Sequence, residues 1–313
     1  MKYLVVGDPH AKPSNLDKIE KLVNMVEEQQ LPTIWLGDQL DTKEIINGKC
    51  LNLWHEYYSN SDLDHIILVG NHDRFNKYSE EHSLQVISTL PNVTVVQSPI
   101  TLDGIDFIPY CDNESIYRHI EQSDAKLGFA HIDIQGFDYG NGVISKEGLS
   151  KDTFTKYSKL IIGHYHKHQQ KDNIMYLGTP FSHSFGESNQ SKYIMTIDTD
   201  TLEYELIETD FPKHVTLEYN CDTNNSVELC IQDKLNDLDY IRAILRGNQE
   251  NIDKVNKKNY PTVKFIEKPT IETKGLAIDE TLDHTAQFKK WAETRNLKET
   301  TIEKGLEFLN NVS

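Results

Sequence analysis

Cysteine is scarce in this 313-residue sequence: it occurs four times, and no two cysteines form a CxxC pair. The sequence therefore shows neither a zinc knuckle nor a redox-active dithiol motif. Long apolar runs are also lacking, so no segment reaches the length of a transmembrane helix. The apolar stretch at the N-terminus is too short for a signal peptide. We therefore predict a cytoplasmic protein with no membrane partner.

Basic residues are outnumbered: Lys and Arg total 32, Asp and Glu total 49, and the formal net charge is −17. This balance argues against broad contact with nucleic-acid phosphates, which attract basic surfaces. Two bound divalent cations would offset only about four of these negative charges. Binding of a nucleic acid would thus require a local basic patch or a partner protein that supplies the contacts to the nucleic acid. Hydrophobic residues still make up 37% of the chain, which is enough for a packed core.

Five apolar segments in the first half of the chain each end just before a residue that can bind a metal ion. The segments 2–6, 33–36, 64–69, 126–130 and 159–162 are followed by Asp8, Asp38, Asn71, His131 and His164. The carboxyl ends of strands collect at one edge of an α/β sheet, where ligands bind. We therefore expect these five residues to converge on one site.

The later sequence differs from this alternating pattern. From about residue 172 we predict β-strands at 174–177, 193–197 and 202–207, then at 216–219, 227–231, 240–245 and 262–266, with a polar helix at 248–259. From Asp279 the spacing of apolar residues predicts two short amphipathic helices around Arg295-Asn296. The chain is thus divided into residues 1–208, 209–270 and 271–313.

The candidate metal ligands offer carboxylate, amide and imidazole groups but no thiolate. They occur in Asp8-Pro9-His10, Gly37-Asp38-Gln39-Leu40-Asp41, Gly70-Asn71-His72-Asp73, His131 and Gly163-His164-Tyr165-His166. Such mixed nitrogen and oxygen ligands favour manganese, iron or zinc. One carboxylate can bridge two cations about 3.5–4 Å apart, and Asp38 is placed to do so.

We therefore predict two metal sites that share Asp38. Metal one takes Asp8, His10, Asp38 and His166, and metal two takes Asp38, Asn71, His131 and His164. A water molecule acidified between the ions would attack phosphorus, and the ions would offset the charge gained in the transition state.

The remaining polar residues of the motifs are assigned supporting roles. We expect His72, which directly follows a ligand, to act as the general acid or as a donor to the leaving oxygen. Asp73 is expected to orient His72 and to raise its pKa, and Asp41 to hold a ligand or loop in place. His183 is a candidate substrate contact because it lies in the segment 179–187. Other histidines, such as His65, are expected to be structural.

Taken together, these motifs resemble the calcineurin-like metallophosphoesterase superfamily over about residues 1–200. The resemblance implies an α/β (α+β) fold: a β-sandwich flanked by helices, with a di-metal site at the strand ends. Tyr176-Leu177-Gly178-Thr179-Pro180 followed by Ser184-Phe185-Gly186-Glu187 resembles, more narrowly, the nuclease subunit of the double-strand-break repair complex. Its bacterial form is the SbcCD-type nuclease, and its phage form is the small subunit of the recombination endonuclease.

This narrower resemblance implies a small α/β capping domain over 209–270 and C-terminal helices over 271–313 that dock on an SMC-like ATPase. It also implies exonuclease and endonuclease activity on DNA in recombination, repair or replication. Two Mn²⁺ ions are the expected cofactors, with Mg²⁺, Fe²⁺ or Zn²⁺ as alternatives. A homodimer is possible, and the location would be the host cytoplasm if the protein is viral.

Two other functions remain open. One is a phosphatase or cyclic-nucleotide phosphodiesterase that uses the same metal site, and the other is a non-catalytic scaffold whose C-terminal helices recruit a partner. The full set of candidate ligands disfavours the scaffold. The sequence beyond residue 200 disfavours the small-molecule enzyme, because a minimal phosphatase needs neither a capping domain nor a docking tail.

Overall fold

The computed structural model describes residues 1–140, 142–223, 227–232, 235, 239–270, 283–294, 297 and 299–312. Two six-stranded sheets form the core of the first part of the chain. The first has the order β12-β11-β1-β2-β3-β4 and the second the order β5-β6-β7-β8-β10-β9. Strands β1 to β4 run parallel to one another, as do β6, β7, β8 and β10.

The bounds of eight strands agree closely with the predicted segments, whereas the strands at Val93–Val96, Ile100–Leu102, Ile105–Ile108 and Gln169–Lys171 were not predicted. The first sheet contains β1 (Lys2–Val6), β2 (Thr33–Trp35), β3 (His65–Leu68), β4 (Val93–Val96), β11 (Tyr193–Asp198) and β12 (Tyr204–Glu208). The second contains β5 (Ile100–Leu102), β6 (Ile105–Ile108), β7 (Leu127–Ala130), β8 (Lys159–Ile162), β9 (Gln169–Lys171) and β10 (Ile174–Tyr176).

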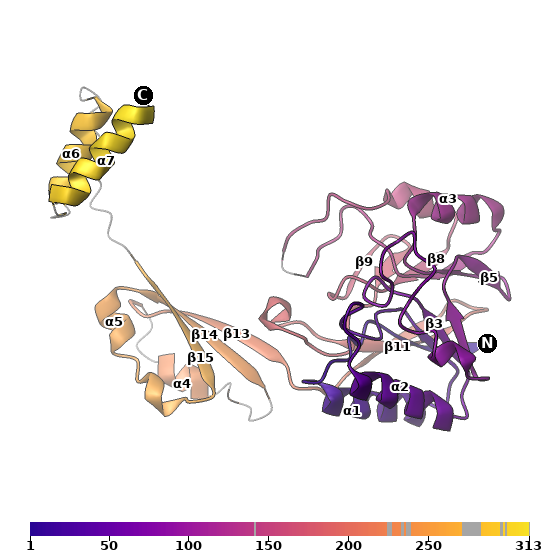
Figure 1. The fold of residues 1–313 in the computed structure, drawn as a ribbon. Coiled ribbons are helices and arrows are strands. Elements are labelled where there is room, and N and C mark those ends of the chain that lie inside the picture. Colours follow the sequence, from indigo (N-terminus) through magenta and orange to yellow (C-terminus); the bar gives the residue numbers. More distant parts are fainter. Residues whose placement is uncertain are drawn as a thin grey trace.

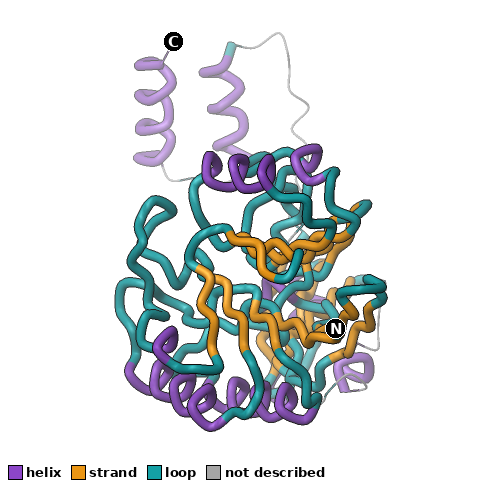
Figure 2. The backbone as a smooth tube through the Cα atoms, turned by 90° about the vertical axis from the view of Figure 1, so that its right-hand side faces the viewer, coloured by secondary structure: helices purple, strands orange, loops and turns teal. Residues whose placement is uncertain are grey.

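The two sheets pack face to face, and helices cover their outer faces (Figures 1 and 2). Successive strand side chains point to opposite faces, so Val5 and Ile34 face Phe107 and Phe129 between the sheets. Their neighbours, such as Leu4, pack outward against the helices. Helices α1 (Leu16–Glu28) and α2 (Gly48–Asn60) cover the first sheet, and α3 (Asn113–Gln122) covers the second. The predicted β-sandwich flanked by helices is confirmed.

The start of α1 positions one of the candidate ligands. The helix begins at Leu16 with Asn15 at the cap position. The Asn15 side chain accepts a hydrogen bond from the Lys12 amide and donates one to the His10 carbonyl. Asn15 therefore fixes the loop that carries His10 to the start of α1.

A third sheet lies within residues 209–270 and has its own hydrophobic core. It contains β13 (His214–Asn220), β14 (Tyr240–Gly247) and β15 (Val263–Pro269), all parallel. Helix α5 (Gln249–Asp253) and a 3-10 turn at Lys257–Asn259 occupy the region predicted as one polar helix. Ile252, Ile241 and Leu245 share the core.

One predicted strand of this region is wrong: residues 227–231 form helix α4 (Val227–Gln232). Val227 and Ile231 both enter the core of the third sheet. They are four residues apart and therefore lie on one face of a helix. A short apolar run does not by itself distinguish a buried strand from a helix.

Helices α6 (His284–Thr294) and α7 (Glu299–Val312) match the two predicted amphipathic helices. They lie side by side (Figure 1). A Cβ atom at Gly305 would fall 2.2 Å from the Phe288 ring, so glycine allows the close approach of α7 to α6. The predicted turn at Arg295-Asn296 and residues 271–282 lie outside the described part of the chain. No described helix combines the length and the apolar character that crossing a membrane requires.

Candidate metal centre

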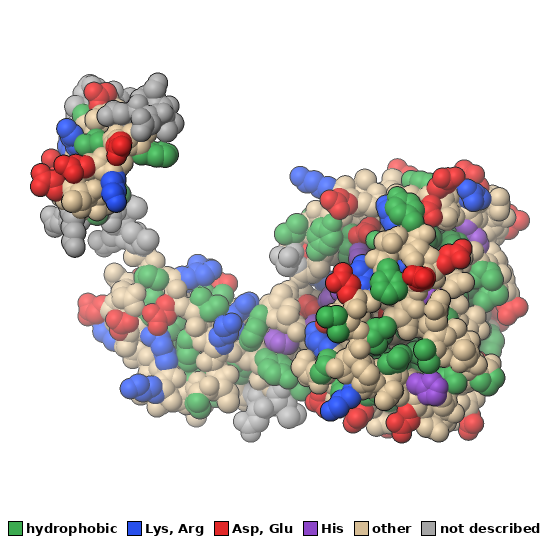
Figure 3. Space-filling view, in the orientation of Figure 1, with side chains coloured by type: hydrophobic (Ala, Val, Ile, Leu, Met, Phe, Trp, Pro, Cys, Tyr) green, Lys and Arg blue, Asp and Glu red, His purple; other side chains and the backbone are tan. Residues whose placement is uncertain are grey.

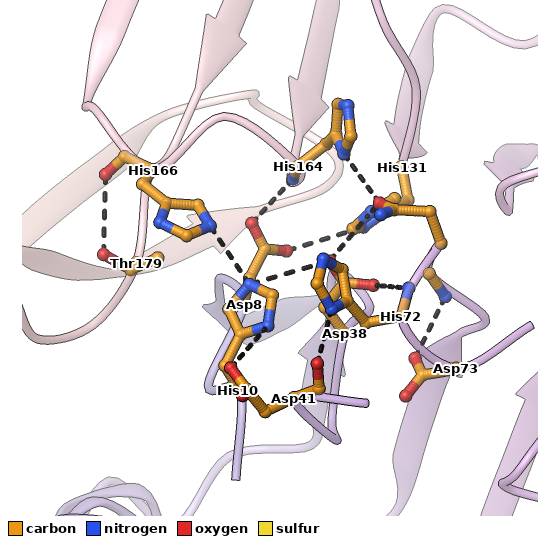
Figure 4. A network of polar contacts seen from close by, with 12 residues as sticks. Asp8, His10, Asp38, Asp41, His72, Asp73, His131, His164, His166 and Thr179 are labelled. Atoms are coloured by element: carbon orange, nitrogen blue, oxygen red, sulfur yellow. Dashed lines mark hydrogen bonds and ion pairs between the residues drawn. The ribbon is translucent and has the colours of Figure 1, made fainter. Parts of the chain in front are cut away.

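The structure brings together all seven predicted metal ligands at the carboxyl ends of parallel strands from both sheets. Figure 4 labels six of them, all except Asn71. Asp8, Asp38 and Asn71 follow β1, β2 and β3 of the first sheet. His131 and His164 follow β7 and β8 of the second sheet. Residues that are far apart in the sequence thus meet because the parallel strands of the two sheets end at the same place.

Asp38 lies at the centre of the cluster. Its Oδ2 atom lies 3.6 Å from His10 Nε2 and 3.5 Å from His131 Nε2. Its Oδ1 atom accepts a hydrogen bond of 2.7 Å from the His72 amide. Potential ligand atoms of His10, Asp38 and His72 lie within 4.8 Å of one another, and so do those of Asp38, His131 and His164. One carboxylate therefore belongs to two groups of donor atoms.

On the metal-two side, three electron-pair donors point at one another. His131 Nδ1 donates to the Leu36 carbonyl over 2.7 Å, so in the neutral ring Nε2 carries the lone pair. His164 Nε2 donates to Asp133 over 2.8 Å, which leaves the lone pair on Nδ1. His131 Nε2 lies 2.9 Å from Asn71 Oδ1, and His164 Nδ1 lies 2.7 Å from it. Asn71 Oδ1 is itself an acceptor directed into the site. A cation held among these atoms would convert three mutually repelling lone pairs into ligands.

The metal-one side has a similar arrangement. His166 Nδ1 donates to Glu187 Oε1 over 2.9 Å, and its Nε2 lies 3.1 Å from His10 Nε2. Asp8 Oδ2 accepts the His164 amide, whereas Asp8 Oδ1 is buried without a hydrogen-bond partner. The two converging imidazole nitrogens and the Asp8 carboxylate, whose Oδ1 atom lies 3.5 Å from His131 Nδ1, offer donors that fit a divalent cation.

The electrostatics of the cluster also suit cation binding. Burial would raise the pKa of Asp38, but the nearby His131 imidazole outweighs burial and lowers it. Asp38 therefore stays ionised. Burial holds the pKa of His10 well below its usual value, so this imidazole is neutral and keeps a lone pair for a ligand bond.

The glycine that precedes three of the ligands leaves room for another ligand. A Cβ atom at Gly70 would lie 2.1 Å from Asp38 Oδ1, and one at Gly163 would lie 2.5 Å from Asp8 Oδ1. At Gly37 it would lie 2.5 Å from His131 Nδ1. The recurrent Gly-ligand step therefore has a packing cause: each strand end passes so close to its neighbour that no side chain fits.

Three of the ligands have a backbone conformation that L-residues rarely adopt. His10, Asp38 and His164 have φ angles of +44°, +50° and +83°. A non-glycine residue in this region costs about 1–3 kcal/mol and persists where surrounding structure or function enforces it. The strain turns each side chain sharply from the strand end into the site.

The role expected of Asp73 is corrected by the structure. Asp73 is fully buried, and its carboxylate accepts the amides of Gly70, Gln39 and Leu40 rather than contacting the His72 ring. It therefore joins the two loops that carry Asn71 and Asp38. His72 is oriented instead through Nδ1, which lies 2.6 Å from the Asp41 carbonyl oxygen.

Asp41 lies where a supporting residue was expected. Its carboxylate is 3.3 Å from Lys12 Nζ and 3.9 Å from His10 Nδ1. Its backbone carbonyl rather than its side chain holds His72.

Two carboxylates that hold predicted metal-binding histidines were not identified from the sequence. Asp133 holds His164 and also accepts the Tyr165 hydroxyl over 3.1 Å. Glu187 holds His166 and is itself held by Lys192 Nζ at 2.6 Å. Such pairs fix the ring orientation of a metal-binding histidine. The sequence pointed to Asp133 only through its place two residues after His131. Glu187 entered the sequence analysis only as the last residue of Ser184-Phe185-Gly186-Glu187.

His183, the candidate substrate contact, lies beside the metal-one histidines. Its ring centroid is 5.3 Å from that of His10 and 5.5 Å from that of His166. Neither of its ring nitrogens has a hydrogen-bond partner.

Comparison with known proteins agrees with this geometry. The model of the family described as calcineurin-like phosphoesterase matches residues 1–247. The chain is 29% identical over 241 residues to exonuclease subunit 1 of Enterobacteria phage T4, covering 70% of this chain and 71% of that protein. It is 28% identical to putative phosphoesterase 244L of Invertebrate iridescent virus 6, covering 82% of this chain and 98% of that protein.

Among solved structures, a novel archaeal phosphodiesterase superposes with a TM-score of 0.37 at 16% identity, covering 66% of this chain and 99% of the other.

Proposed function

This chain belongs to the calcineurin-like phosphoesterase family, and from that premise we propose that it is a two-metal nuclease subunit that hydrolyses phosphodiester bonds in DNA. The observation that carries the proposal is the similarity to phage T4 exonuclease subunit 1 over 70% of the chain. That relative is named as a subunit of an exonuclease.

The charge distribution supports a DNA ligand in one part of the molecule. Residues 209–270 carry nine basic and ten acidic side chains, so this part contributes almost nothing to the net charge of −17. Basic side chains are spread over its surface in Figure 3. Arg242 stacks on Phe185 and donates to the Phe185 carbonyl, and Phe185 lies two residues from Glu187, which holds His166. We propose that this part guides the DNA backbone to the metal centre.

The chain's own residues have distinct proposed tasks at the centre. When bound, two divalent cations, for which we propose Mn²⁺, would acidify a bridging water and offset the charge of the transition state. Asp38 would hold both cations, while Asp133 and Glu187 keep His164 and His166 in their ligating orientation. His72 Nδ1 donates to the Asp41 carbonyl, so the imidazolium form would carry its second proton on Nε2, from which it could pass to the leaving oxygen.

We also propose that the C-terminal helices dock on an ATPase partner. Phe308 of α7 is 68% exposed and Trp291 of α6 is 40% exposed. Large aromatic side chains at this exposure are typical anchors of protein interfaces. The helices lie beyond the region matched by the family model, which ends at residue 247.

The proposal is tested by comparing linear duplex DNA with a small aryl phosphate as substrates in the presence of Mn²⁺. Wild type should cut DNA. The His72→Ala variant should lose turnover by about 10²–10⁴-fold while still binding two Mn²⁺ ions, because its backbone amide still supports Asp38. The exposed His55 provides a matched control, and His55→Ala should cut normally.

Cleavage of the aryl phosphate alone, with or without an added ATPase subunit, would contradict the nuclease proposal and favour a phosphatase or cyclic-nucleotide phosphodiesterase. Loss of one Mn²⁺ ion in His72→Ala would instead make His72 a ligand, consistent with its place in the group with His10 and Asp38.

A further inference from the structure

His183 has an unusual environment for a histidine. It lies in the segment that joins β10 to β11, and its ring packs on Phe181 with a centroid separation of 4.8 Å. Both ring nitrogens are shielded from solvent, and neither has a hydrogen-bond partner. An unpartnered buried polar atom costs about 1–3 kcal/mol. Native proteins rarely keep such atoms without a reason.

The position of the ring indicates what that reason is. His183 lies edge-on to His10, with an interplanar angle of 87°, and it also neighbours His166. Its backbone amide donates to Glu187 Oε2, whose other oxygen holds His166. One carboxylate thus fixes both a predicted metal ligand and the segment that carries His183.

His183 nevertheless differs from the predicted ligands. Its ring nitrogens have no hydrogen-bond partner, whereas the Nε2 atoms of His10 and His166 lie only 3.1 Å apart. Unlike His164 and His166, its ring is not held by a carboxylate among the described residues. The His183 ring therefore lies just outside the predicted ligands. Its own two nitrogens are free to donate and to accept a hydrogen bond beside them.

We propose that His183 is a positioning residue that hydrogen-bonds a water molecule bound at the metal-one side, beside His10 and His166. A neutral imidazole has one acceptor and one donor nitrogen, so it can accept a hydrogen bond from a metal-bound water and stabilise that water. The inference rests on the two-metal site of the proposed function but not on DNA being the substrate.

The test compares His183→Phe, which keeps the ring volume without nitrogens, with His183→Gln, which restores a donor and an acceptor. Mn²⁺ binding is measured by calorimetric titration, and thermal unfolding is measured without and with Mn²⁺. His183→Phe should still bind two ions at saturation, with the affinity of one site lowered about 10-fold or more. His183→Gln should recover most of that affinity, and the control His55→Phe should match wild type.

The metal-free protein supplies a second readout. Removing two unpartnered nitrogens should leave the Tm of metal-free His183→Phe equal to or above that of wild type, while its stabilisation by Mn²⁺ falls. A structural role would predict the opposite, namely a lower Tm and unchanged Mn²⁺ affinity. Should His183→Phe fail to fold, His183→Ala replaces it in the same titration.

Three results would overturn the inference: unchanged Mn²⁺ affinity in His183→Phe, the loss of one ion altogether, or no recovery in His183→Gln. Loss of an ion would indicate direct ligation. If DNA is not cut but the titrations follow the expected pattern, the nuclease proposal fails and the role of His183 stands.

Discussion

Replacing Gly70 by alanine should weaken the binding of both metal ions through a single added methyl group. The Cβ atom would lie 2.1 Å from Asp38 Oδ1 and 2.4 Å from the Asp38 amide nitrogen, whereas ordinary contact is 3.4–4 Å. Relief therefore requires Asp38 to retreat by about 1 Å, and ligand positions tolerate only about 0.2 Å. The φ angle of Gly70 is not in the positive range, so the backbone accepts alanine and the effect comes from the added methyl group alone.

Because Asp38 belongs to both predicted ligand sets, Gly70→Ala should weaken Mn²⁺ binding at both sites by at least about 100-fold, or about 2.7 kcal/mol. Overpacking should also lower the metal-free free energy of unfolding by about 1–3 kcal/mol. Calorimetric titration with Mn²⁺ measures the first effect and urea unfolding the second. Gly48→Ala is the control, because no atom lies within 4 Å of its Cβ position. Two ions bound by Gly70→Ala with wild-type affinity would refute the shared role of Asp38.

Three further outcomes are expected. Glu187→Gln should lower Mn²⁺ affinity about 10–100-fold in a titration, because His166 loses its carboxylate. Asp106→Asn should lower the free energy of unfolding in urea by about 3 kcal/mol, because Asp106 is buried and accepts the Tyr157 hydroxyl over 2.6 Å. Burial lowers the pKa of His65 to about 4. The folded state therefore resists protonation of this ring, and as pH falls from 6.5 to 4 wild type should lose about 3 kcal/mol more stability than His65→Gln.

The sequence was sufficient for most strands of the two large sheets and for the convergence of the candidate ligands, because both depend on local patterns. An apolar run that ends in glycine and a polar residue marks a strand end. Parallel topology then brings such ends together without knowledge of any loop. Helix α4 was missed because Val227 and Ile231 fit a strand and a helix equally well over so few residues. His65 was rightly expected to be structural, since Trp35 Nε1 donates to it and it bonds Ser61.

The supporting residues could not be predicted because their partners are set by the direction of side chains across loops. Asp73 is adjacent to His72 in the sequence, yet the chain turns between Gly70 and Asp73 and carries the carboxylate inward to backbone amides. Glu187 is 21 residues from His166 and Asp133 is 31 residues from His164. No periodicity relates residues at such separations.

The positive φ angles at His10, Asp38 and His164 could not be predicted either, because non-glycine residues rarely adopt them, although Asp and His do so more often than most. Asparagine or glycine would relieve the backbone strain at each position but would remove an imidazole or a carboxylate. The strain therefore persists because the ligand itself is required. One cause explains both the strained ligands and the glycines at 37, 70 and 163. Strand ends from two sheets approach one another so closely that a side chain before the ligand would clash. Only a sharp turn that follows a glycine directs the donor atoms into a common space.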